Sequence, residues 1–227
     1  MKKASKATRL KPITKPKPEF EPARLVAKSQ NQKEYIHSIQ QNDITICYGP
    51  AGSGKSLCAI GVAVGLLRAG KIDKIIITRP VVESDEKIGF LPGSADEKLE
   101  PYLRQLFDSL KMFASYTEIA TWKNTGVLEV APIGFCRGRT FNGLVIVDEA
   151  QNCTLKQLIM LLTRIGVGGK MIIEGDLTQS DLLRNFQGGF LRCIEKLQNI
   201  DGIGIIEMES VDVVRHRLIP TIIERLS

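Results

Sequence analysis

The chain has 227 residues, 43% of them hydrophobic, and a formal net charge of +6; this length suits one sizeable core and is too short for two full-size domains. Its five cysteines are scattered and lack CxxC pairing, which argues against a disulfide framework and a zinc site and favours buried thiols in a reducing compartment. No apolar run reaches about eighteen residues and no signal-peptide pattern occurs, so we expect a soluble, cytoplasmic protein without a membrane partner.

The positive charge is concentrated at the N-terminus. Residues 1–28 carry nine Lys or Arg and two Glu, which leaves −1 for the other 199 residues, and they hold four of the ten prolines. Such a segment cannot bury enough apolar surface to fold alone, so we predict a basic flexible arm over residues 1–27 and a single domain over 28–227. The arm would attract a nucleic-acid backbone by counterion release, or it would act as a solubilising tail.

After the arm, β-branched runs alternate with helical patterns. A short amphipathic helix is predicted over 28–41, and strands over 44–48, 74–78, 127–131, 144–147, 171–174 and 203–208. Further helices are predicted over 57–67, 99–113, 155–165, 188–198 and 218–226. This alternation predicts an α/β fold with a mostly parallel sheet, helices on both faces, and a ligand site at the carboxyl ends of the strands.

A glycine loop directly follows the first predicted strand and precedes a helix. It consists of Gly49, Pro50, Ala51, Gly52, Ser53, Gly54, Lys55 and Ser56. Strand, glycine loop and helix in this order are typical of a phosphate-binding loop, whose backbone N–H groups and helix N-terminus surround the phosphates of a nucleotide. In that arrangement Lys55 reaches the β- and γ-phosphates, and the hydroxyl group of Ser56 binds Mg²⁺.

Two further segments supply the groups that hydrolysis requires. The apolar run 144–147 ends in Asp148 and Glu149, of which Asp148 would hold the metal ion and Glu149 would orient a water molecule in line with the γ-phosphate. The next strand leads to Gln179, which we expect to bond the γ-phosphate or that water. The alternative for Gln179 is a solvated turn residue.

Several motifs together resemble the PhoH-like family, over about residues 30–222. They lie at 49–56, 78–80, 86–93, 101–103, 137–140, 147–152, 175–179 and 212–216. The resemblance implies an ATP-binding and ATP-hydrolysing domain, similar to the first RecA-like domain of superfamily 1 helicases. It also implies assembly into a homo-oligomer, often a hexameric ring, and action on or regulation by RNA or DNA.

The resemblance further suggests roles for individual side chains. Gln32 matches a glutamine that reads adenine in helicase relatives, and an amide can pair with N6 and N7 of that base. Arg79 matches a motif that touches nucleic-acid phosphates; its alternative is an ion pair with Glu83 or Glu86.

Three arginines are candidates for an arginine finger, which stabilises transition-state charge and can come from a neighbouring subunit. Arg215 is the first candidate, and Arg137 and Arg139 are the alternatives. Arg137 and Arg139 are, with Arg79, also candidate nucleic-acid contacts. The family motif usually has a proline where this chain has Arg217, so the placement of Arg215 stays open.

Three functions remain open from the sequence. The first is an ATPase acting on, or regulated by, RNA or DNA as an oligomeric ring. The second is a nucleotide-dependent binding module without significant turnover, and the third is a small-molecule kinase. The kinase ranks lowest because it needs an arginine-rich lid over the phosphates and no glutamate after the metal-binding aspartate. Aromatic residues make up only 6% of the chain, so no stacking platform for single strands is evident.

Overall fold

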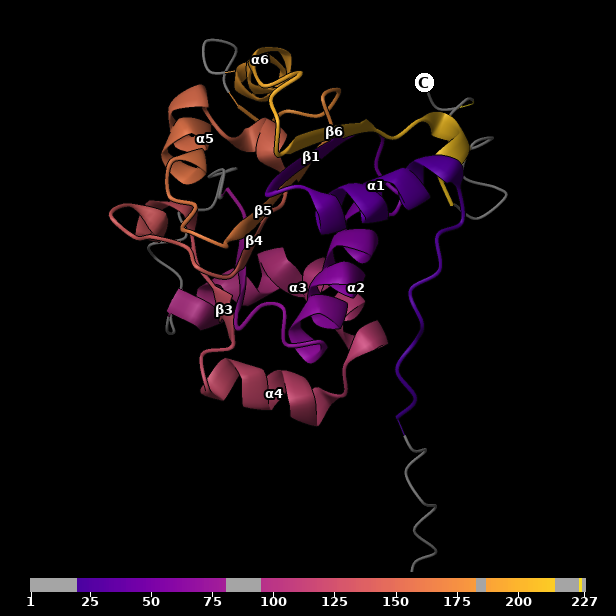
Figure 1. Ribbon diagram of the computed structural model, residues 1–227, viewed down its shortest axis with the longest axis vertical. Coiled ribbons are helices and arrows are strands. Elements are labelled where there is room, and N and C mark those ends of the chain that lie inside the picture. The colour runs from indigo at the N-terminus through magenta and orange to yellow at the C-terminus, as the bar shows by residue number, and fades with distance from the viewer. Residues whose placement is uncertain (1–19, 81–94, 183–186, 215–224, 226–227) are drawn as a thin grey trace, which may run out of the picture.

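A computed structural model describes residues 20–80, 95–182, 187–214 and 225 (Figure 1). Its helices are α1 (Gln30–Gln41), α2 (Lys55–Arg68), α3 (Ala95–Phe113), α4 (Tyr116–Asn124), α5 (Leu155–Leu162) and α6 (Gly189–Lys196). Its strands are β1 (Ile44–Tyr48), β2 (Ile75–Thr78), β3 (Leu128–Val130), β4 (Leu144–Val147), β5 (Lys170–Gly175) and β6 (Ile203–Glu207). The predicted helix over 218–226 falls almost wholly outside the described residues.

The described strands form one sheet in the order β3-β2-β4-β5-β1-β6, and every neighbouring pair is parallel. Parallel strands need crossover connections, which contain α-helices except between β3 and β4, where the connection has a short 3-10 helix, Ile133–Cys136. All strand carboxyl ends therefore meet at one edge, where the glycine loop leaves β1.

Side chains alternate between the two faces of the sheet, as the period of a strand requires. In β4, Leu144 and Ile146 face the core shared with α1 to α4, whereas Val145 and Val147 face the core shared with α5 and α6. Both faces are thus buried under helices, and the predicted α/β class is confirmed (Figure 1).

Three helices differ from prediction by more than two residues. α3 begins at Ala95, before the predicted start at residue 99. α5 ends at Leu162 because residues after it pair with another segment: the Phe141 amide donates to the Arg164 carbonyl and the Gly166 amide to the Phe141 carbonyl, each at 2.8 Å. α4 was not predicted, although Ser115 and Glu118 form a capping box at its start. That spacing is the signal that would have found it.

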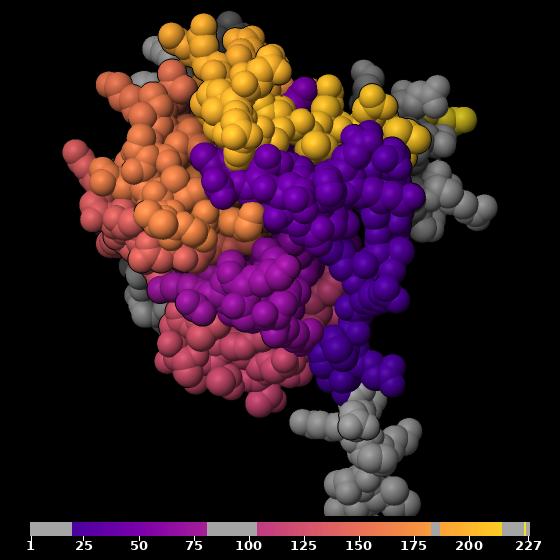
Figure 2. All heavy atoms as spheres, in the orientation of Figure 1, coloured from indigo at the N-terminus to yellow at the C-terminus, as the bar shows by residue number. Residues whose placement is uncertain are grey.

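The chain is packed against the domain a few residues before the predicted boundary at residue 28. The Ala23 amide donates to the Met112 carbonyl of α3 at 2.8 Å, and Leu25 packs beside Gly61 and Phe113. Further along, α1 lies against β6, which brings the two ends of the described domain together on one face (Figure 2).

All five cysteines are free and buried, as predicted. Within the described ranges, no helix is both long and apolar enough to span a membrane.

Candidate functional site

The glycine loop connects β1 to α2 through backbone conformations that favour glycine. Gly52 and Gly54 have φ angles of 84° and 85°, in the left-handed region. At Gly49, a Cβ atom would lie 2.2 Å from the carbonyl oxygen of Met208, so a second segment passes directly over the loop. The glycines therefore provide both the turn and the space that this fold needs.

Three segments distant in sequence hold the backbone of the loop. The Gln32 side-chain amide donates to the Ser53 carbonyl at 2.8 Å, and Asp176 Oδ2 accepts from the Ala51 amide at 3.1 Å. The Val214 amide donates to the Gly52 carbonyl, also at 3.1 Å. The loop is thus fixed from α1, from the end of β5 and from the segment after β6.

Lys55 begins α2 and lies back over the loop. Its Nζ atom donates to the carbonyl oxygens of Gly49 and Pro50 at 2.8 and 3.0 Å. This places the ammonium group beside the loop backbone, which is where the sequence predicted a contact with phosphate.

Asp148 and Glu149 follow β4 and share an arginine partner. Arg79, which follows the neighbouring strand β2, lies 3.6 Å from Asp148 Oδ2 and 3.3 Å from Glu149 Oε1. Burial and the charge of Glu149 raise the pKa of Asp148, and Arg79 opposes this shift. The proposed ion partners of Arg79, Glu83 and Glu86, lie outside the described residues.

Glu149 has a backbone conformation that is rare for a residue with a side chain. Its φ angle is 55°, in the left-handed region. Such a conformation costs about 1–3 kcal/mol and persists where the surrounding structure enforces it, often at functional sites.

Gln151 is the neighbour that fixes Glu149. Its side-chain Nε2 donates to Glu149 Oε2, and its Oε1 accepts from the Asp176 amide at 3.0 Å. Gln151 is 6% exposed and its bond to the Asp176 amide is buried, whereas its bond to Glu149 is only partly buried. It lies in the motif at residues 147–152, but no role was predicted for it.

A second buried polar pair lies beneath the loop. Tyr35 on α1 donates from its hydroxyl group to Glu174 Oε2 at 3.1 Å, and neither side chain has exposed surface. Burial and the negative charge of Asp148 raise the pKa of Glu174 to about 8. No role was predicted for either residue, because only the fold joins them.

A cavity of about 200 Å³ brings together most of the predicted site. Lys55, Ser56, Asp148, Glu149 and Gln179 all line it, with Ala51, Gly52, Gly54, Leu57, Gly175 and Asp176. No site role was predicted for five of its lining residues, Leu57, Gly175, Asp176 and, on α3, Gln105 and Ser109. As expected, the tips of β4 and β5 are neighbours, so Gln179 faces the same space as the two carboxylates.

Mg²⁺ is usually held by one or two carboxylates together with phosphates and water. The Ser56 hydroxyl and the Asp148 carboxylate in this cavity fit that donor set. No group of three or more His, Cys, Asp or Glu side chains within the described part of the chain forms a metal cage of its own.

Other predicted residues do not line this cavity. Gln32 is 4% exposed, and both ends of its amide are bonded, to the Ser53 carbonyl and the Lys28 amide. Arg139 forms a bidentate ion pair with the Glu129 carboxylate. The Arg137 side chain is exposed. Arg215 lies outside the described residues, so its role stays a prediction.

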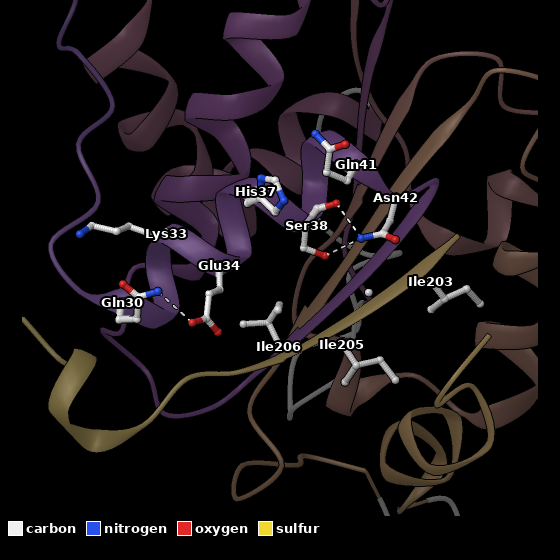
Figure 3. Close-up of a pocket in the computed structure, with 11 residues that line it drawn as sticks. Gln30, Lys33, Glu34, His37, Ser38, Gln41, Asn42, Ile203, Ile205 and Ile206 are labelled. Atoms are coloured by element: carbon white, nitrogen blue, oxygen red, sulfur yellow. Dashed lines mark hydrogen bonds between the residues drawn. The ribbon is translucent and has the colours of Figure 1, made fainter. Parts of the chain in front are cut away.

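A larger groove of about 650 Å³ lies between α1 and β6 (Figure 3). Lys33, Glu34 and His37 line it from α1, and Ile205 and Ile206 line it from β6. It includes no loop residue and neither carboxylate after β4. Although this groove is the larger of the two, its lining residues therefore do not suit phosphate binding.

The parallel sheet, the glycine loop after β1 and the carboxylates after β4 define a P-loop NTPase. The protein-family model described as "PhoH-like protein" matches residues 24–227. The chain belongs to this family, which confirms the resemblance found in the sequence.

Several relatives are similar over most of this chain. A PhoH-like protein of Bacillus subtilis is 46% identical over 198 residues, which cover 87% of this chain and 62% of that protein. A PhoH-like protein of Mycobacterium tuberculosis strain H37Rv is 45% identical over 198 residues, covering 87% and 56%. Protein PhoH of Escherichia coli K12 is 38% identical over 197 residues, covering 86% and 56%. The chain thus spans little more than half the length of these relatives.

Among solved structures, the Pif1 helicase from Candida albicans matches with a TM-score of 0.41 and 14% sequence identity. The match covers 89% of this chain and 44% of the helicase.

Proposed function

We propose that this chain binds ATP with Mg²⁺ and hydrolyses it to ADP and phosphate. The observation that supports this most is the single cavity lined by Lys55, Ser56, Asp148, Glu149 and Gln179. A phosphate contact, two metal-binding oxygens and a carboxylate for water are the parts that NTP hydrolysis requires.

In this mechanism the loop backbone and Lys55 hold the β- and γ-phosphates, while Ser56 and Asp148 hold Mg²⁺. When bound, the metal ion neutralises charge on the phosphate oxygens. Glu149, fixed by Gln151, orients water toward the γ-phosphorus. The water oxygen forms the new P–O bond and gives up a proton to the Glu149 carboxylate, while the bond to the bridging oxygen breaks and ADP leaves with that electron pair.

The chain would complete its site with another copy of itself, in a ring. A phosphoryl-transfer site often needs an arginine at the transition state. None of the described residues that line the cavity is an arginine, and the nearby Arg79 pairs with both carboxylates. Arg215, Arg137 or Arg139 of a neighbouring subunit would then be the finger.

RNA or DNA is the proposed polymer partner, with the basic arm and Arg79, Arg137 and Arg139 as candidate contacts. Gln32 is retained as a candidate adenine contact, which would require its amide to exchange the Ser53 carbonyl for the base.

Phosphate release and nucleotide binding, measured separately, test the central proposal. Lys55→Ala should abolish productive nucleotide binding. Glu149→Gln should keep binding and block hydrolysis, because the amide cannot accept a proton from water. Equal hydrolysis by Glu149→Gln and the parent would refute the role of Glu149.

The same assay separates the alternatives. Binding without turnover in the parent would favour a binding module, and a phosphorylated small-molecule product would favour a kinase. Hydrolysis that neither RNA nor DNA changes would count against a nucleic-acid partner. A monomeric mass with and without ATP would count against the ring.

A further inference from the structure

The Glu174 carboxyl group is fully buried and only partly hydrogen-bonded. Its Oε2 accepts from the Tyr35 hydroxyl at 3.1 Å. Its Oε1 has no hydrogen bond of ordinary geometry to any residue that the structure describes. Leaving a buried polar atom without a partner costs about 1–3 kcal/mol, so this oxygen requires a physical explanation.

The surroundings of Glu174 are the residues expected to hold Mg²⁺. In the register of the sheet Val147 lies opposite Ile173, so the next residues, Asp148 and Glu174, lie side by side. The Ser56 hydroxyl and the Asp148 carboxylate both interact with the Glu174 carboxyl group. Glu174 therefore interacts with both expected metal ligands.

A serine that binds a metal ion through its oxygen still carries a hydrogen, and that hydrogen needs an acceptor. We propose that Glu174, held by Tyr35, is the positioning residue for the metal site. Its Oε1 accepts the hydrogen of the Ser56 hydroxyl and turns the lone pairs of that oxygen toward Mg²⁺. Partners that orient metal ligands in this way commonly change metal affinity about 10- to 100-fold when removed. This inference rests on the proposed Mg²⁺-dependent binding of nucleotide.

The main alternative is that Tyr35 and Glu174 only join α1 to the sheet. Thr45 and Ser38 provide a matched control, because their hydroxyl groups, 3.2 Å apart and buried, also join α1 to β1. Thr45→Val removes that bond with little change of shape. A purely structural role predicts that this variant and the Tyr35 and Glu174 variants all lower the melting temperature and leave the Mg²⁺ dependence of binding unchanged.

The test is binding of a fluorescent ADP analogue to the full chain, in EDTA and across a Mg²⁺ titration, with melting temperatures recorded in parallel. Glu174→Met removes the acceptor and should raise the half-saturating Mg²⁺ concentration about 10-fold, while affinity in EDTA stays within about twofold. Glu174→Gln keeps an acceptor oxygen and should remain within about threefold of the parent. Thr45→Val should leave the Mg²⁺ dependence unchanged.

A double-mutant cycle makes the assignment to Ser56 specific. In a Ser56→Ala background, Glu174→Met should have little further effect on the Mg²⁺ requirement, because the hydrogen to be accepted is gone. An equally large effect there would overturn the proposal.

The proposal would also be overturned if Glu174→Met had the Mg²⁺ dependence of the parent. The same holds if Glu174→Gln needed as high a Mg²⁺ concentration as Glu174→Met. If Glu174→Met does not fold, Tyr35→Phe carries the test: it should raise the Mg²⁺ requirement, and an effect no larger than that of Thr45→Val would refute the positioning role. A parent that binds nucleotide equally with and without Mg²⁺ would instead refute the proposed function.

Discussion

Gln151 makes two hydrogen bonds, one to Glu149 and one to the Asp176 amide, and substitutions can distinguish their effects on activity and on stability. The acceptor oxygen holds the Asp176 amide, and the donor nitrogen holds Glu149. Gln151→Leu removes both bonds. Gln151→Glu keeps an acceptor for the Asp176 amide but replaces the donor by a negative charge facing Glu149.

The magnitudes follow from burial. Without Gln151 the buried Asp176 amide loses its partner, which costs about 1–3 kcal/mol. The bond from Gln151 to Glu149 is charge-assisted, but Glu149 is 29% exposed, so water can partly replace this bond when it is lost. Its loss therefore adds about 1 kcal/mol to the destabilisation. Gln151→Leu should therefore lower the free energy of unfolding by about 2–4 kcal/mol. Gln151→Glu should also be destabilising, because it places a second carboxyl group against Glu149 at a buried position.

Hydrolysis should respond differently from stability. Both variants release Glu149 from its orienting contact, and a displacement of about 1 Å in a reacting group can reduce the rate about 100-fold. We expect a fall in kcat of that order in both variants, with nucleotide affinity little changed.

Urea unfolding and steady-state phosphate release measure the two effects. Gln157→Met is the matched control: it removes a glutamine that caps α5 through the Thr154 amide and hydroxyl, outside the cavity lining. It should cost about 1 kcal/mol of stability and leave kcat unchanged. A parental kcat in Gln151→Leu would refute the claim that Gln151 holds Glu149.

Three further predictions concern the fold. Gly49→Ala should destabilise the protein strongly, because its Cβ would lie 2.2 Å from the Met208 carbonyl oxygen. Gly65→Ala in α2 should stabilise the protein by about 0.5–1 kcal/mol, because no atom lies within 4 Å of the added Cβ. Thermal unfolding would contradict this prediction if both changes had the same effect. The Arg139 guanidinium, aided by Lys74, lowers the pKa of Glu129 to about 2 from 4.5. The stability that ionised Glu129 contributes is therefore complete above about pH 4.5 and is lost as the pH falls toward 2. In Glu129→Gln, the free energy of unfolding in urea should vary less with pH over that range. An unchanged pH dependence would count against the ion pair. The five buried thiols should react with a chromogenic disulfide only after denaturation, and fast reaction of the native protein would contradict their burial.

Much of the site could be predicted because its signals are local. A glycine loop between a strand and a helix has a meaning set by a few adjacent residues, and so does an apolar strand that ends in Asp148 and Glu149. Strand and helix alternation likewise predicted the α/β class, because the crossover connections between parallel strands are usually helices.

Residues without such a signal were missed. Gln105 and Ser109 reach the cavity only because α3 packs against α2, which follows the loop. Arg139 has the charge of a phosphate contact, yet its observed partner is Glu129 on β3. Side-chain chemistry alone does not indicate which of several possible partners will be near.

Sequence alone therefore predicts a phosphate loop, a candidate metal-binding aspartate and an adjacent glutamate, because the spacing along the backbone determines their relative positions. It does not establish what holds them. The Tyr35 to Glu174 bond joins residues 139 positions apart, and Gln32 reaches the loop from a helix that precedes β1. Such contacts depend on the order of strands in the sheet and on helix packing, which are long-range properties of the folded chain.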